Sequence, residues 1–265
     1  MGVMAYYYRT ATSGNADSAL VHIFLIVYSE SMEKPLLVAA RPIHCTSLIN
    51  DISDRLLGLG MKRQASNDNR VQIYRASGGG CVELKIVDHN SPEDGQTFLG
   101  FEVADELSLN QISEILAAET DWLEIKETTP TRLSAISSDG VPIRFSVSDE
   151  VVLDVGTTPL QIAQMWFSAD VAKQSAFLSN LSATPIFPSE SEPDYQMNGG
   201  GRTVLHTEPN ARASAGLIYS GDIEELQRET NQKGYYWPIK QEYWGRYLAL
   251  TDEGLDGELT WVNEQ

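Results

Sequence analysis

Short apolar runs and two stretches of helical spacing alternate along the first half of the chain. Strands are predicted for Leu36–His44, Val71–Arg75, Cys81–Val87, Phe98–Val103, Leu133–Ile136 and Pro142–Val147. Apolar residues at helical spacing predict a helix that follows Ser47 and ends at Gly58 and Gly60. Ser108 and Gln111 have the spacing of a capping box, so a second helix is predicted to begin at Ser108.

The second half repeats this order of elements. Strands are predicted for Leu160–Phe167, Tyr195–Met197, Thr203–Thr207, Ala215–Tyr219, Tyr247–Leu250 and Glu258–Val262. A helix capped by Asp170 extends to Leu181. Another begins at Asp222, which forms a capping box with Glu225, and closes at Lys233-Gly234. The repeated order predicts a duplicated α+β chain.

Glycine-rich turns occur at matching places in the two halves. Gly78-Gly79-Gly80 and Gly199-Gly200-Gly201 each lie between two predicted strands. They lack the following Lys-Ser/Thr of a phosphate loop and do not connect a strand to a helix. We therefore interpret both triplets as hairpin turns that need positive φ. Asp139-Gly140 and Asp256-Gly257 are a second matching pair of turns.

Several motifs in the second half resemble a known superfamily. They are Asp170-Val171-Ala172, Asp222-Ile223-Glu224-Glu225-Leu226, Trp244-Gly245-Arg246 and Asp256-Gly257. Together with the repeat, they are similar to the vicinal oxygen chelate (VOC) superfamily, which includes glyoxalases, bleomycin-resistance proteins and extradiol dioxygenases. Over roughly residues 35–264, the resemblance implies an α+β fold of two tandem βαβββ modules, whose curved mixed sheets surround cavities. These cavities are the natural ligand sites.

The domain organisation follows from the repeat. Residues 32–149 are predicted to form the first VOC-like module and residues 159–265 the second. Residues 1–31 differ in composition from the rest, and Met32 begins a typical cytosolic opening. We therefore expect translation to start at Met32, with residues 1–31 as an upstream extension or a poorly packed tail.

The resemblance also implies where a metal would bind. Family enzymes use His, Gln or Glu from the first, middle and last strands of a module, and these side chains suit divalent cations. The aligned positions are Ala40, Phe98 and Arg144 in the first half, and Ala163, Ala215 and Trp261 in the second. None of these six side chains is such a donor. A shift of one or two residues would introduce His44, Gln161, Gln164 or Glu258, but no single shift gives a full set. We therefore predict no metal and no cofactor.

A candidate ligand site lies in the second module. The alternation of a strand places Ala163, Met165 and Phe167 on the cavity face that the resemblance implies. The last strand adds Trp261, with Asn263 at the same parity, and His206 offers one hydrogen bond. The segment Tyr235, Tyr236, Trp237, Tyr243 and Trp244 is rich in aromatic residues, and Arg246 follows it. Alternatively, the rings only pack the sheet and helices, and His206 is an ordinary strand histidine.

The first module offers fewer candidates. Ala40, Pro42 and His44 are predicted to share a face, and Arg144 joins them from the last strand. Arg144 either orients an anionic group or forms a surface ion pair. His44 and Cys45 are strand neighbours that point to opposite faces, which argues against a Cys/His nucleophile.

Composition narrows the possible partners. The 265 residues include 42% hydrophobic residues, enough for a substantial core, and carry a formal charge of −18. Such acidity argues against binding to nucleic acid or to an anionic membrane surface. The apolar stretch Ala19–Tyr28 is too short to span a bilayer. Two cysteines, Cys45 and Cys81, are typical of reduced thiols in the cytoplasm. A small-molecule ligand is the predicted partner, and a homodimer is left open.

Three functional hypotheses follow. In the first, the chain is a metal-free binding protein for a small, partly aromatic molecule, with Met165, Phe167, His206, Trp244, Arg246, Trp261, His44 and Arg144 as candidate ligand-binding residues. In the second, it is a metal-dependent glyoxalase-type lyase or isomerase, or a dioxygenase, with a displaced metal site. In the third, the first half is a structural partner and only the second half binds. No catalytic residue is predicted.

Overall fold

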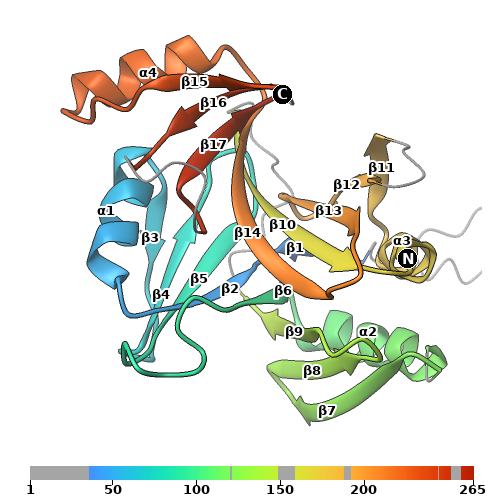
Figure 1. The fold of residues 1–265 in the computed structure, drawn as a ribbon. Helices are drawn as coiled ribbons and strands as arrows, with labels where there is room; N and C mark the ends of the chain where they lie inside the picture. Colours follow the sequence, from blue (N-terminus) through green and yellow to red (C-terminus); the bar gives the residue numbers. More distant parts are fainter. Residues whose placement is uncertain (1–35, 120, 149–158, 188–191, 244, 252–257) are drawn as a thin grey trace, which may run out of the picture. The chain divides into compact units, whose positions relative to one another are not determined.

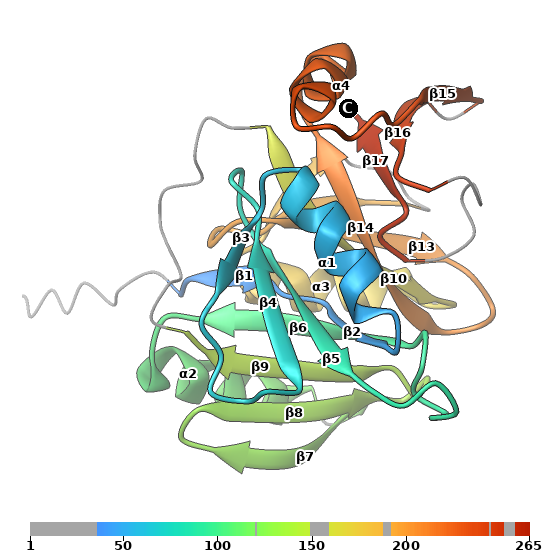
Figure 2. The ribbon, with the colours of Figure 1, turned by 90° about the vertical axis from the view of Figure 1, so that its left-hand side faces the viewer.

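The computed structural model describes residues 36–119, 121–148, 159–187, 192–243, 245–251 and 258–265. Strands in these residues form one sheet of nine strands and one of eight (Figures 1 and 2). Residues 1–31, and most of the predicted boundary between Asp149 and Pro159, lie outside the described residues. The start at Met32 and the division into residues 32–149 and 159–265 therefore stay predictions.

Sheet 1 is formed by the first half of the chain. Its elements are β1 (Val38–Ala40), β2 (Ile43–Thr46), α1 (Ile49–Gly58), β3 (Lys62–Gln64), β4 (Val71–Arg75), β5 (Cys81–Ile86), β6 (Thr97–Val103), α2 (Glu106–Ala118), β7 (Leu123–Thr129), β8 (Arg132–Ser137) and β9 (Pro142–Val147). The strand order is β3-β4-β5-β2-β6-β9-β8-β7, and β1 also pairs with β6. β2 runs parallel to β5 and antiparallel to β6.

Sheet 2 repeats this arrangement. Its elements are β10 (Leu160–Ser168), α3 (Val171–Asn180), β11 (Thr184–Phe187), β12 (Asp194–Gln196), β13 (Arg202–Thr207), β14 (Arg212–Tyr219), α4 (Ile223–Gln232), β15 (Ile239–Glu242), β16 (Gly245–Ala249) and β17 (Trp261–Glu264). The strand order is β11-β12-β13-β10-β14-β17-β16-β15. The predicted α+β fold of two tandem modules is confirmed. In the described residues, each sheet contains two successive βαβββ units, not one.

The sequence pattern missed four strands, and all of them lie at the ends of the two sheets: β3, β7, β11 and β15. A strand at a sheet edge has a neighbour on one side only and commonly carries charged residues. The three residues of β3 are Lys-Arg-Gln, and β7 is exposed over most of its length. Such strands lack the apolar alternation that identifies inner strands.

The helix starts correct one of the predicted caps. The N-cap of α2 is Asp105, whose carboxylate accepts a hydrogen bond from the backbone N–H of Ser108. The capping box at Ser108 is therefore wrong, and the helix begins at Glu106, two residues earlier than predicted. Asp222 caps α4 and accepts from Glu224 N–H. Asp170 occupies the N-cap of α3 without a side-chain cap hydrogen bond.

The predicted strand Leu36–His44 is interrupted at Arg41-Pro42, between β1 and β2. At this interruption the chain crosses close over Gly100 of β6, and a Cβ there would lie 1.8 Å from the carbonyl oxygen of Arg41. Only glycine fits this approach. The register against β6 is the same on both sides of the interruption, because Ala40 pairs with Phe101 and His44 with Thr97, so Ala40 and His44 lie on one side of the sheet as predicted. Arg144 is in register with Gly100 and lies on the other side, so the prediction that it joins them is wrong.

Each sheet has a helix face, which packs against α-helices, and an opposite side that we call the open face. Two buried clusters cover the helix faces, and both combine residues from the two halves. One joins α2 and α3, and Trp122 packs against Trp166 there with ring centres 6.0 Å apart. The other joins α1 and α4 (Figure 1). Because the two sheets share both clusters, the halves are expected to unfold together.

The two glycine triplets meet where the sheets join. Gly79 and Gly200 form an antiparallel bridge, and the φ values of +114° and +102° confirm the predicted positive φ. A Cβ on Gly79 would lie 2.8 Å from the Cα of Gly200, and a Cβ on Gly200 would lie 2.9 Å from the Cα of Gly79. Backbone hydrogen bonds from Gly78 to Leu160 and from Ala40 to Gly200 complete the junction.

None of the helices in the described residues combines the length and apolar character needed to cross a membrane.

Candidate functional site

The open face of sheet 2 has two small residues next to a tryptophan. Ala163 on β10 pairs with Gly216 on β14, and Trp261 on β17 follows in the same row, because its neighbour Val262 pairs with Leu217. Two very small residues therefore lie beside an indole ring. Trp261 and Met165 are both only partly buried, so apolar surface on this face remains accessible.

A polar atom lies beside that indole. Asn263, two residues after Trp261, is on the same face, and its Oδ1 is buried without a hydrogen-bond partner among the described residues. Leaving a buried acceptor unpaired costs about 1–3 kcal/mol. Tyr247 packs edge-on against Trp261, with ring centres 6.2 Å apart and an interplanar angle of 71°. The arrangement combines an aromatic surface with an acceptor for which the described part of the chain supplies no donor.

Phe167 is enclosed at one end of this face. Its ring stacks on His206 of β13 at 4.8 Å, and the guanidinium of Arg212 on β14 lies 3.5 Å from its centre. His206 Nδ1 is also 3.4 Å from a carboxylate oxygen of Glu192. Phe167 is 8% exposed, so its ring is occupied by these neighbours. Its predicted place on the face is observed, but it offers little surface for a ligand.

Arg202 defines the opposite end of the face. Its guanidinium donates to Gln161 at 3.0 Å, to Asp194 at 3.1 Å and to Ser220 at 3.1 Å. Sequence reasoning did not single out Arg202, because a lone arginine in a strand gives no indication of burial. With its hydrogen bonds made inside the protein, Arg202 closes this end and does not offer a binding group.

The residues at the expected metal position do not fit a metal. Ala163, Gly216 and Trp261 occupy adjacent places on the open face, and none has a donor atom suited to a divalent cation. The predicted middle-strand position, Ala215, lies on the helix face in the buried cluster with α1 and α4. In sheet 1, Ala40 is also in a buried cluster. No group of three or more His, Cys, Asp or Glu in the described residues is placed to hold a metal ion.

The aromatic segment before β16 serves a different purpose from the predicted one. The rings of Tyr235 and Trp237 pack at a tilt of 32° with their centres 4.8 Å apart, and both lie against Gly58 at the end of α1. Tyr236 and Tyr243 are exposed. Trp244 lies outside the described residues. Tyr235 and Trp237 therefore help to join α1 to α4 and do not line the open face.

Arg246 and His44 also lie away from the open faces. Arg246 forms ion pairs with Glu224 at 3.1 Å and with Glu264 at 3.3 Å. Its neighbour Tyr247 is in register with Asn263, so Arg246 points to the helix face. His44 is in register with Leu84 and Thr97, which places it on the helix face of sheet 1.

His44 is buried in a polar contact that connects the two halves. Its Nδ1 lies 3.0 Å from Thr97 Oγ1, and burial lowers the pKa of His44 to about 4. Thr97 also hydrogen-bonds Glu258, for which burial is the largest effect on the pKa and raises it. Glu258 accepts a hydrogen bond from the backbone N–H of Ala215. The structure thus brings two of the alternative metal-ligand candidates toward each other, at a junction and not on an open face.

Solved structures resemble this fold over most of its length. A catechol 2,3-dioxygenase matches with a TM-score of 0.54 and 12% identity, covering 86% of this chain and 87% of that one. The 2,3-dioxygenase LapB from Pseudomonas sp. KL28 matches with a TM-score of 0.53 and 11% identity, covering 87% and 93%. The Mn(II)-bound glyoxalase from Novosphingobium aromaticivorans matches with a TM-score of 0.53 and 11% identity, covering 86% and 81%.

The chain has the fold of the VOC superfamily. The predicted resemblance is thereby confirmed at the level of the fold. No protein-family model matches the sequence, and no curated protein matches it either. At these low identities, function on the VOC fold has to be argued from the residues of the site.

Proposed function

We propose that this VOC-fold protein binds a small, flat, partly aromatic molecule on the open face of sheet 2, and that it does so without a metal. Such binding would serve to sequester the molecule, to give resistance to it or to sense it. One observation supports the proposal above the others: the small residues Ala163 and Gly216 and the flexible side chain of Met165, whose Cε lies 3.1 Å from the Cβ position of Gly216, lie beside the partly buried ring of Trp261. Aromatic rings prefer to stack on such a surface.

The polar groups narrow the ligand further. The Oδ1 of Asn263, which has no hydrogen-bond partner among the described residues, favours a ligand with an N–H or O–H donor next to its ring. The formal charge of −18 favours a neutral or cationic ligand, since anions are repelled at long range. A cationic group also gains from the face of an indole. We therefore infer a neutral or cationic aromatic molecule that carries a hydrogen-bond donor.

Binding can be tested with a library of neutral and cationic aromatic compounds. Hits found by quenching of tryptophan fluorescence are measured again by calorimetry, because replacing a tryptophan alters the fluorescence itself. We expect Trp261→Phe to weaken a genuine hit about tenfold while shifting the melting temperature little. Asn263→Ala should weaken hits that carry a donor and spare those that lack one.

A matched control is Trp237→Phe, because Trp237 packs at Gly58 and not on the open face. Its affinity for a hit should equal that of the unaltered protein. If no compound binds, or if Trp261→Phe binds every hit as tightly as the parent protein, the proposal is wrong.

The metal-free part of the proposal has a separate test. Metal analysis of the purified protein should find no stoichiometric iron, manganese, zinc or nickel. A tightly held stoichiometric metal would instead favour a metal-dependent lyase, isomerase or dioxygenase with a displaced site. A cytoplasmic location agrees with the two buried free thiols, Cys45 and Cys81. That location and the homodimer both stay predictions.

A further inference from the structure

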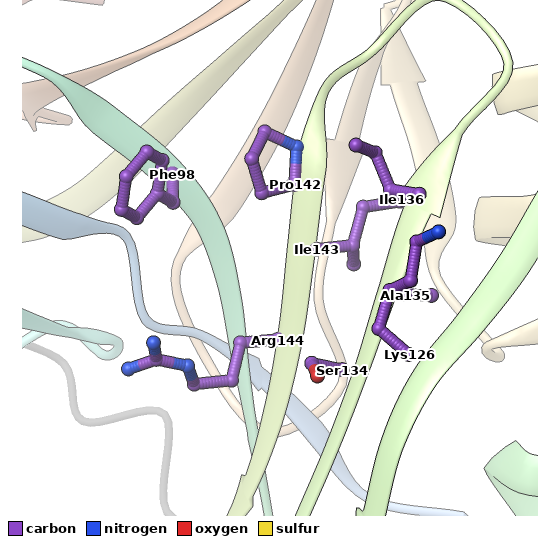
Figure 3. A pocket seen from close by; sticks show the side chains of 8 residues that line it. All are labelled: Phe98, Lys126, Ser134, Ala135, Ile136, Pro142, Ile143 and Arg144. Carbon is purple, nitrogen blue, oxygen red and sulfur yellow. The ribbon is translucent and has the colours of Figure 1, made fainter.

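The open face of sheet 1 contains a pocket of its own. Its volume is about 190 Å³, below the roughly 300–1,000 Å³ typical of pockets for drug-sized ligands. Side chains from four neighbouring strands line it: Phe98, Lys126, Ser134, Ile136, Pro142 and Arg144. Figure 3 shows the apolar Phe98, Pro142 and Ile136 toward one end, with Arg144 and Ser134 toward the other. The pocket is therefore amphipathic, with one cationic end.

A buried charge network lies next to that cationic end. Glu102 is fully buried and is paired with Arg75 and with Arg41. Glu83 accepts two hydrogen bonds from Arg41, at 2.8 and 3.1 Å. Three arginines, counting Arg144, thus share two glutamates. Among these five described side chains the arginines outnumber the glutamates by one, in a protein whose formal charge is −18.

Arg144 is the arginine that carries this excess. Its distance to Glu83 is 3.6 Å, which is longer than a hydrogen bond. The same carboxylate already binds Arg41 at 2.8 Å. The side chain of Arg144 is 25% exposed, so its N–H donors can reach a molecule in the pocket. A guanidinium fork matches the two oxygens of a carboxylate.

Lys126 adds a second cation at the rim. Its side chain is 48% exposed, and its described ionic contact is with Glu124, whose side chain is 70% exposed. An exposed ion pair of this kind contributes little and is easily exchanged. Lys126 therefore assists the approach of an anion without fixing its position.

We propose that this pocket binds a small carboxylate with a single ring or a branched apolar body, with its carboxylate on Arg144 and its apolar part against Phe98, Ile136 and Pro142. The site is separate from the open face of sheet 2. It binds an anion, whereas the ligand proposed for sheet 2 is neutral or cationic. Its success or failure is therefore independent of the function proposed above.

Benzoate is the probe, and benzamide is its neutral counterpart of the same shape. Calorimetry should show one saturable benzoate site, with benzamide binding at least about tenfold more weakly. Amide chemical shifts should change in β6, β8 and β9. Equal affinity for the two probes, or no saturable benzoate binding, would overturn the proposal.

Variants test the roles of the two ends. Arg144→Gln should weaken benzoate at least about tenfold, and Arg144→Lys should restore part of the loss, because a lysine keeps the charge but not the fork. Arg63→Gln is the matched control, because Arg63 is an exposed arginine on β3 and should leave the affinity unchanged. Unaltered benzoate affinity in a folded Arg144→Gln variant would refute the role of Arg144.

A further variant keeps the test independent of the charge network. Ser134→Phe fills the pocket without altering any charged residue, and it should abolish benzoate binding at an unchanged far-ultraviolet circular dichroism spectrum. If benzoate still binds to Ser134→Phe with the parent affinity, the pocket is not the site. Trp261→Phe should bind benzoate like the parent, which separates this site from that of sheet 2.

Discussion

The open faces of the two sheets have the same backbone plan and opposite chemistry. In sheet 1, Arg144 is in register with Gly100. In sheet 2, Trp261 lies at the corresponding place beside Gly216. Glu102, two residues after Gly100, is buried among arginines, and the residue two positions after Gly216 is Ile218. The duplication has kept the strand order and the register, while the side chains of each face have become specialised independently.

The difference has an energetic side as well. Burying charged groups requires that they be paired, because desolvation is costly. In sheet 1, Glu83 is therefore paired with Arg41, and Glu102 with Arg75. Arg144 has the longer contact of 3.6 Å to Glu83 and can exchange it for a ligand. On the open face of sheet 2, Ala163, Gly216 and Trp261 are uncharged, so a ligand can contact them without an ion pair having to be broken.

The largest expected effect comes from breaking the network of sheet 1. Glu102→Ala removes a buried carboxylate from Arg75 and from Arg41, of which Arg41 retains Glu83. It should lower the free energy of unfolding by about 3–5 kcal/mol, as measured by urea denaturation. Glu127→Gln, at an exposed site on β7, should stay within about 0.5 kcal/mol of the parent. If Glu102→Ala were as stable as that control, the network would not be a structural requirement.

The second prediction concerns the contact between Gly79 and Gly200, to which each half contributes one glycine. Gly79→Ala and Gly200→Ala should each cost about 2–5 kcal/mol in unfolding free energy, from positive φ together with a backbone clash. Gly140→Ala is the control, because its φ is +90° and no atom lies within 4 Å of its Cβ position. It should cost only about 1–2 kcal/mol. A clear difference between the two junction variants would contradict the symmetry of the contact.

A smaller effect is expected from His44, which belongs to sheet 1 only. Its pKa is lowered from 6.5 to about 4, so the unfolded chain binds the proton more tightly. The resulting stability is fully present above about pH 6.5 and is lost as the pH falls toward 4. Between pH 7 and pH 5 the loss should be about 2 kcal/mol.

Comparing the pH dependence of urea unfolding for the parent and for His44→Gln measures this contribution. The variant should lose that part of the pH dependence, whereas His89→Gln, at an exposed histidine, should retain it. Parallel curves for the parent and His44→Gln would show that His44 does not titrate as described.

The smallest expected effect is that of a chelator. A metal bound only by the folded state adds about 2.7 kcal/mol when it is present at a hundredfold excess over its dissociation constant. Because the metal positions in neither sheet carry suitable donors, EDTA should leave the melting temperature unchanged. A drop of several degrees would show that a metal is held elsewhere.

The inner strands and the fold class could be predicted from the sequence, because inner strands bury alternate apolar residues. Edge strands could not, as Lys62, Arg63 and Gln64 of β3 show. Missing one edge strand per unit made two βαβββ units look like one. Strand parity predicted the position of Trp261 on the open face and the common side of Ala40 and His44. It did not predict that this side of sheet 1 is the helix face, because that depends on how the helices pack.

The candidate groups that the sequence missed depend on distant partners. Asn263 was placed on the correct face, but that its Oδ1 lacks a donor follows only from the packing around it. The sequence left two interpretations of Arg144, a group that orients an anion or a member of a surface ion pair, and the structure has features of both. It has a long contact with Glu83 and also an opening toward a pocket. The pocket itself depends on β7, a strand that the pattern did not reveal.

The contact between Gly79 and Gly200 also has a consequence for synthesis. The two residues are far apart in the sequence, so sheet 1 leaves the ribosome well before β13 is made. Until then, the backbone N–H groups of Gly78 and Ala40 lack their partners Leu160 and Gly200, and the helix face of sheet 1 lacks α3 and α4. The nascent first half therefore passes through a period with an uncovered apolar surface, which ends only when the hairpin around Gly200 has emerged and closed onto it.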